Sequence, residues 1–110
     1  MKAFKMPRRP IFVVLKDIEE FAPVHGNWRR LDELLDELWS GGVAQGQIPL
    51  LFRVFERFPD DDGAGVLWSI VHGVESLTFD YGAFLKESMA RQPSHMGAIM
   101  LQRLDKANES

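Results

Sequence analysis

The chain has 110 residues, of which 45% are hydrophobic and 11% aromatic, enough apolar material for one modest core and too little length for two. It contains no cysteine, which excludes disulfides, thiolate metal sites and a cysteine nucleophile. The net charge is −3, but the first ten residues carry four basic residues and no acid, so residues 11–110 carry −7. An acidic body repels phosphate backbones, so we expect no nucleic-acid binding and favour a basic protein partner.

The N-terminal residues 1–10 contain Lys2, Lys5, Arg8 and Arg9, and we expect them to form a flexible basic arm. The apolar run at residues 11–15 is too short for a signal-peptide core or a membrane span, so we expect a cytoplasmic protein with no membrane segment. Apolar residues continue at helical spacing to about residue 22, which favours a helix stopped by Pro23. Residues 11–15 alone would also suit a strand.

The clearest helix in the chain runs from Trp28 to Trp39, between the expected N-cap Asn27 and the glycine pair at 41–42. Its apolar residues recur at helical spacing: Trp28, Leu31, Leu34, Leu35, Leu38 and Trp39. Acids lie on its outer side, namely Asp32, Glu33, Asp36 and Glu37. Acids one turn apart repel unless arginines or a partner offset them, so this side is either a solvated surface or a second-choice docking surface at Asp32, Asp36 and Glu37.

Pro49 suits the first turn of the next helix, which we expect to run to about Phe58 and to be closed by Pro59. We expect the following helix to span about residues 62–77. The aspartates at 60–62 would provide a cap and negative charge at the positive end of its dipole, and each of these two effects is worth roughly 0.3 to 2 kcal/mol. Three glycines fall inside that range: Gly63, Gly65 and Gly73. Each would cost about 1 kcal/mol in a helix interior, which predicts that a neighbouring helix approaches closely.

This predicted helix has two faces. One is a buried apolar stripe: Leu67, Ile70, Val71, Val74 and Leu77. On the other, Trp68, His72 and Glu75 stand at i, i+4 and i+7, below the aspartates. Trp68 is either a core residue packed on the helix at 81–89 or an interface anchor, and His72 is either a partly buried, hydrogen-bonded residue or an interface residue.

The remaining sequence predicts two more helices. Asp80 can cap a helix that carries Tyr81, Phe84 and Met89, and Pro93 separates it from a last helix that carries Met96, Met100 and Leu104. We therefore expect a single all-α domain over residues 11–106, with five or six short helices in a compact bundle or a short HEAT-like stack of helical hairpins. We expect the tail at residues 107–110 to fray.

The residues that could carry chemistry form no recognisable catalytic or metal motif. His25, His72 and His95 lie in separate elements, and the aspartate run lacks the ligand spacing of a calcium loop. No nucleophile elbow, phosphate-binding loop or dinucleotide fingerprint is present. His72 with Glu75 would be a weak acid and base pair, so we expect no enzymatic activity, no cofactor and no metal.

Residues 55–75 (FERFPDDDGAGVLWSIVHGVE), with Tyr81, residues 84–88 (FLKES) and residues 91–94 (RQPS), resemble small helical immunity proteins of bacterial polymorphic-toxin and contact-dependent growth inhibition systems. The resemblance covers about residues 48–104. It implies a cytoplasmic inhibitor without activity of its own, which binds the toxic C-terminal domain of a cognate toxin. An acidic body would suit a basic toxin such as a nuclease.

On this interpretation, acids would bind arginine or lysine of the toxin, and Trp68 would anchor the complex. The residues expected to contact the toxin are Glu56, Asp60, Asp61, Asp62, Trp68, His72 and Glu75. The alternative function is a helical adaptor or regulatory subunit of a bacterial complex, with weak self-association through the helix at 28–39.

Overall fold

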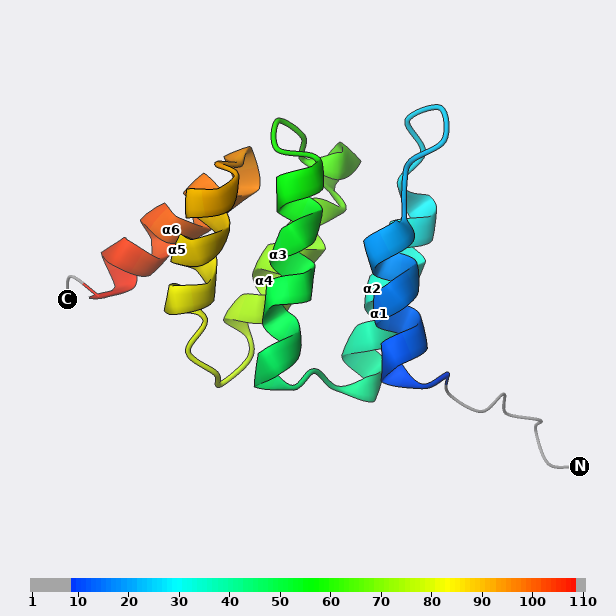
Figure 1. Cartoon of the computed structure of the whole chain (residues 1–110), viewed down its shortest axis with the longest axis horizontal. Helices are drawn as coiled ribbons and strands as arrows, with labels where there is room; N and C mark the ends of the chain where they lie inside the picture. Colours follow the sequence, from blue (N-terminus) through cyan, green and yellow to red (C-terminus); the bar gives the residue numbers. More distant parts are fainter. Residues whose placement is uncertain (1–8, 109–110) are drawn as a thin grey trace, which may run out of the picture.

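The computed structural model describes residues 9–108, and it confirms the all-α fold class (Figure 1). The α-helices are α1 (Ile11–Glu20), α2 (Arg29–Gly41), α3 (Ile48–Arg57), α4 (Leu67–Glu75), α5 (Gly82–Arg91) and α6 (His95–Asn108). Two short 3-10 helices, η1 (Gln45–Gln47) and η2 (Gly63–Gly65), lie before α3 and α4. Within the described range there is no β-strand.

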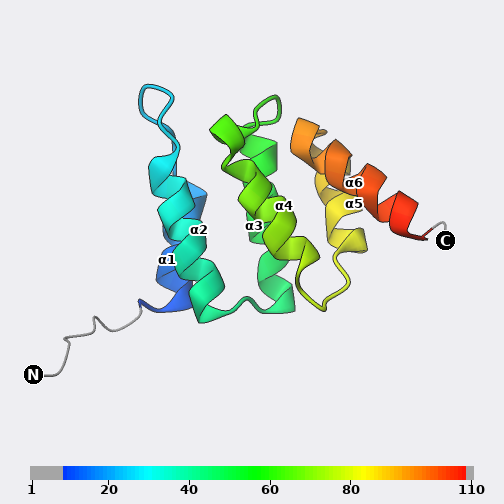
Figure 2. The same cartoon turned by 180° about the vertical axis from the view of Figure 1, so that it is seen from behind.

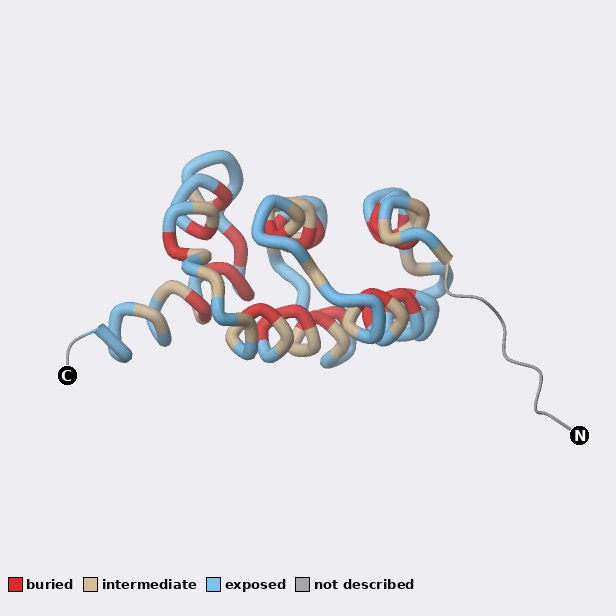
Figure 3. Tube along the Cα trace, turned by 90° about the horizontal axis from the view of Figure 1, so that it is seen from below, coloured by how far each residue is buried: buried red, intermediate tan, exposed pale blue. Residues whose placement is uncertain are grey.

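The helices form three antiparallel hairpins, α1/α2, α3/α4 and α5/α6, which lie side by side (Figures 1 and 2). In one layer α3 contacts both α1 and α5, and in the other α4 contacts both α2 and α6 (Figure 3). Over residues 9–108, no helix of the first hairpin contacts a helix of the third. The helices of this all-α domain therefore follow one another as a short stack of hairpins.

The core lies between the two layers and is built from the apolar stripe of each helix. The stripe predicted for α4 is confirmed, because Leu67, Ile70, Val71 and Val74 are fully buried, and Leu77 follows the helix half-buried. On α2, Leu31, Leu34, Leu35 and Leu38 are buried in the same way. Burial of each such side chain stabilises the fold by about 1.5 to 3 kcal/mol, so these stripes hold the layers together.

The first predicted helix is confirmed as α1, and the strand alternative is wrong. The helix ends at Glu20, before Pro23, and Phe21 has extended backbone angles. The guanidinium of Arg57 on α3 donates hydrogen bonds to the carbonyl oxygens of Ile18 and Phe21. Because the last carbonyls of a helix have no partner within it, Arg57 completes the end of α1 and joins it to the second hairpin.

The predicted start of the helix after Pro59 is wrong. Residues 60–66 form an irregular loop and η2, and α4 begins only at Leu67. The reason is backbone conformation: Gly63, Ala64 and Gly65 have φ values of 62°, 53° and 90°, in the left-handed region. Asp62 therefore caps the short helix η2, and none of the three aspartates caps α4.

Gly73 is the one glycine of the three that lies inside α4, and it confirms the expected close approach. A Cβ atom at Gly73 would overlap the indole ring of Trp39 on α2. The other two glycines, Gly63 and Gly65, serve the left-handed loop.

The ends of the described range differ from our expectation. α6 continues to Asn108, so residues 107 and 108, which we expected in a frayed tail, belong to that helix. Residues 109 and 110 of the expected tail and residues 1–8 of the expected arm lie outside the described residues.

Candidate functional site

The aspartates at 60–62 are exposed on the loop between α3 and α4, at the edge of the stack where all three hairpins turn (Figure 1). The Oδ1 atom of Asp61 accepts a hydrogen bond from the backbone N–H of Gly63 at 3.0 Å, and that of Asp62 accepts one from Ala64 at 3.1 Å. Such bonds stabilise turns and helix N-termini, and the bond of Asp62 caps η2. Each of these carboxylates retains an oxygen for a partner, and Asp60 makes no side-chain hydrogen bond to any described residue.

Trp68 and His72 lie one turn apart on α4, directly after this loop. Their ring centroids are 5.6 Å apart, and the ring planes are tilted by 37°. Trp68 is half-buried and packs against the core, whereas His72 is exposed and its imidazole forms no hydrogen bond within the described residues. The partly buried, hydrogen-bonded interpretation of His72 is therefore wrong. We call the set Asp60, Asp61, Asp62, Trp68 and His72 the α4 surface.

Glu56 lies outside the α4 surface because it is held inside the stack. It belongs to α3, in the other layer, and its side chain is 14% exposed. Its carboxylate accepts hydrogen bonds from the Ser88 hydroxyl at 2.7 Å and from the Arg91 guanidinium at 2.9 and 3.1 Å. Burial opposes ionisation of Glu56, but the bonds from Arg91 and Ser88 outweigh it, so its pKa is lowered.

Glu75 is also engaged within the molecule, at the far end of α4. Its carboxylate accepts two hydrogen bonds from Arg103 on α6, both at 2.8 Å. The structure therefore separates the predicted toxin-binding set into residues of the 60–62 loop and the first turns of α4, and two glutamates that bind arginines of the third hairpin.

The acids that we predicted as a second-choice docking surface also differ in their surroundings. Asp32 and Asp36 are exposed on α2. Glu37 instead accepts two hydrogen bonds from Arg9, at 2.7 and 2.8 Å, and Arg9 also donates to Asp17 of α1 at 2.9 Å. The bonds from Arg9 lower the pKa of Glu37. Arg9, which we expected in a flexible arm, is thus fixed to the first hairpin.

The described surface carries more free acids than free bases. The acids that form no ion pair among residues 9–108 are Glu19, Glu20, Asp32, Asp36, Asp60, Asp61, Asp62, Asp80, Glu87 and Asp105. The corresponding bases are Lys16, Arg53, Arg57, Lys86 and Lys106. Ion pairing therefore leaves the acidic excess on the surface, where it can attract a basic partner.

Over the part of the chain that the structure describes, no three His, Cys, Asp or Glu residues are grouped as metal ligands would be. None of the described helices is long and apolar enough to cross a membrane. No protein-family model, curated protein or solved structure gives a significant match to the chain.

Proposed function

We propose that this protein is an immunity protein, which binds a cognate toxin domain in the cytoplasm and neutralises it through the α4 surface. The observation that carries the proposal is the pair of neighbouring rings, Trp68 and His72, on the helix that follows three exposed aspartates. An aromatic anchor with a polar surround is the arrangement in which a few residues supply most of the binding energy.

Each part of the α4 surface has a physical role in this proposal. The unshared carboxylate oxygens of Asp61 and Asp62 would accept charge-assisted hydrogen bonds from arginine or lysine of the toxin. Trp68 already packs on the core, so little side-chain freedom is lost when a partner covers its exposed part. The surrounding acids would steer a basic toxin, such as a nuclease, toward this surface.

The experiment is co-expression and pull-down with the product of the gene immediately upstream, combined with a growth assay in cells that express that product. The test variant is Asp60→Lys with His72→Ala, because neither side chain forms an internal hydrogen bond within the described residues. The control is Asp105→Lys. Asp105 is an exposed acid on α6 that forms no ion pair within residues 9–108. We expect the test variant to lose binding and protection at least tenfold, while the control keeps both.

Two results would contradict the proposal in different ways. Unchanged binding by the Asp60→Lys, His72→Ala variant would exclude the α4 surface as the contact. Failure of the wild-type protein to bind the upstream product or to protect cells would exclude immunity. The alternative, a helical adaptor, is favoured by the hairpin stack itself, because such stacks present extended faces to partners. An upstream gene for a metabolic or regulatory protein would support that alternative.

A further inference from the structure

The loop before α4 is joined to the third hairpin. The backbone N–H of His95, the first residue of α6, donates to the carbonyl oxygen of Pro59 at 2.7 Å. The turn between α5 and α6 therefore lies beside the loop that carries the aspartates at 60–62, and both views of the fold show the two together (Figures 1 and 2). Because a stable interface covers about 800 Å² of each partner, a partner that covers these aspartates also reaches the start of α6.

The first turn of α6 is fixed and presents one large polar side chain to solvent. The Ser94 hydroxyl accepts a hydrogen bond from the backbone N–H of Gly97 at 3.0 Å, which caps the helix. Ser94 and Met96 are buried, whereas His95 is exposed, and its imidazole forms no hydrogen bond within residues 9–108. The imidazole of His95 is therefore available to a partner as a donor or an acceptor.

The charge of these two neighbouring segments favours a basic partner. Residues 58–74 and 92–102 contain the three aspartates and no other Asp, Glu, Lys or Arg. The arginines that flank the segments are engaged elsewhere, since Arg57 donates to carbonyl oxygens at the end of α1 and Arg91 binds Glu56. The N-terminus of α6 offsets only about half of one charge. Most of the charge of the three aspartates therefore remains uncompensated.

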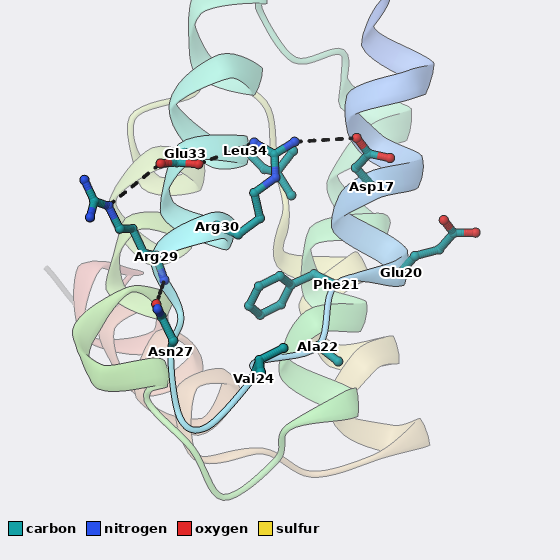
Figure 4. Close-up of a pocket in the computed structure, with 10 residues that line it drawn as sticks. All are labelled: Asp17, Glu20, Phe21, Ala22, Val24, Asn27, Arg29, Arg30, Glu33 and Leu34. Carbon is teal, nitrogen blue, oxygen red and sulfur yellow. Dashed lines mark hydrogen bonds and ion pairs between the residues drawn. The ribbon is translucent and has the colours of Figure 1, made fainter.

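The turn between α1 and α2 differs in its charge. Arg29 and Arg30 lie beside it, where they pair with Glu33 and Asp17 (Figure 4). The two arginine side chains are 84% and 55% exposed, so they present positive charge to any partner at the first hairpin. A basic partner is therefore attracted to the second and third hairpins more than to the first.

We propose that the toxin contact extends from the α4 surface to His95, so that a basic segment of the toxin bridges the second and third hairpins. The aspartates pair with its arginines or lysines, and the His95 imidazole forms a hydrogen bond with it at the edge of the contact. A bound toxin then holds the third hairpin in place, in addition to the ion pairs of Glu56 and Glu75. This inference rests on the proposed function, because its partner is the same basic toxin.

The test measures binding of the full chain to the purified product of the gene immediately upstream by surface plasmon resonance. A charge at the edge of an interface acts mainly on the association rate, so His95→Glu should raise that rate about threefold and His95→Lys should lower it about threefold. The same substitutions at His25, the exposed histidine of the first turn, are the matched controls and should have less effect. High salt should reduce the difference between the two variants at position 95.

A second measurement is amide hydrogen exchange of the wild-type chain, alone and in the complex. We expect bound toxin to slow exchange in the first turns of α6 about tenfold, because opening of the third hairpin would then break the contact. The first turns of α1, in the first hairpin, provide the internal control and should exchange at the same rate in both states.

The outcomes separate this inference from the proposed function. Equal association rates of His95→Glu and His95→Lys, equal responses at positions 95 and 25, or unchanged exchange in α6 would each overturn the bridging contact. If the wild-type chain still protects cells in such a case, immunity stands and only the contact at His95 is excluded. If the wild-type chain does not bind the upstream product, the proposed function fails and this inference fails with it.

Discussion

The two seams between neighbouring hairpins share one hydrophobic core, but different interactions reinforce it. Between the first and second hairpins, the Trp39 ring lies over Gly73, and Trp28 packs edge-on against Phe58 with ring centroids 5.0 Å apart. Between the second and third hairpins there is one ion pair in each layer, Glu56 with Arg91 and Glu75 with Arg103. We call these the apolar seam and the ionic seam. Among residues 9–108, no ion pair crosses the apolar seam.

The difference shows that two seams of one continuous core can be reinforced either by close apolar packing or by ion pairs. The apolar seam requires that α4 present no side chain at Gly73, because the indole occupies that space. The ionic seam requires that two glutamates stay ionised and hydrogen-bonded while they are largely removed from water. The apolar seam should therefore be sensitive to added volume, and the ionic seam to pH and to loss of one partner.

The largest expected loss of stability comes from a substitution at the apolar seam. Gly73→Leu forces the Trp39 ring out of its position, and overpacking of this kind costs about 3 kcal/mol of unfolding free energy. The matched control is Gly46→Leu, since a Cβ atom there meets nothing within 4 Å, and we expect a change of about 0.5 kcal/mol or less. Urea unfolding followed by tryptophan fluorescence measures both. Equal stability of the two variants would mean that Trp39 can relocate freely.

A smaller loss of stability is expected from a substitution at the ionic seam. Glu56→Ala leaves the Ser88 hydroxyl and the Arg91 guanidinium without their acceptor, which should reduce the unfolding free energy by about 2 kcal/mol. Glu87→Ala, at an exposed acid on α5, should change it by about 0.5 kcal/mol or less. Thermal melts at neutral pH compare the two. A Glu56→Ala protein as stable as Glu87→Ala would show that this pair contributes nothing to the seam.

The smallest expected difference between the seams is in how the stability of the protein depends on pH. The pKa of Glu56 is below its ordinary value of 4.5 in the folded protein, so the unfolded chain binds the proton more readily. Its contribution to stability is therefore complete above the ordinary pKa and is lost as pH falls through the lower, folded pKa. We expect Glu56→Gln to lose less stability than wild type when pH drops from about 6 to about 3. Parallel stability curves would exclude this role for Glu56.

The local features of the fold could be predicted from the sequence, because the spacing of apolar residues reports directly on a helix face. That argument identified the buried positions of α4 and the leucines of α2. It failed at residues 60–66, since glycine and aspartate suit a helix start and a left-handed turn equally well from composition alone.

The candidate site was less predictable, because it depends on contacts between distant residues. Nothing near Glu56 or Glu75 in the sequence indicates that Arg91 and Arg103, 35 and 28 residues away, bind them. The same holds for Arg9 and Glu37. A cleft between the end of α1 and the start of α2, lined by Phe21, Val24 and Leu34, was also missed, because it arises from the turn between two helices, where helical periodicity gives no information.

Each hairpin contacts only its neighbours in the stack, and this affects which parts of the molecule can unfold locally. Because the first and third hairpins do not touch within the described residues, either can detach locally without exposing the other. Opening of the middle hairpin disrupts both seams at once, so α3 and α4 belong to the part of the molecule with the highest free energy of local unfolding. Trp68 and His72 of the α4 surface are thus carried by the most protected hairpin, and a partner would meet them already ordered, at little entropic cost.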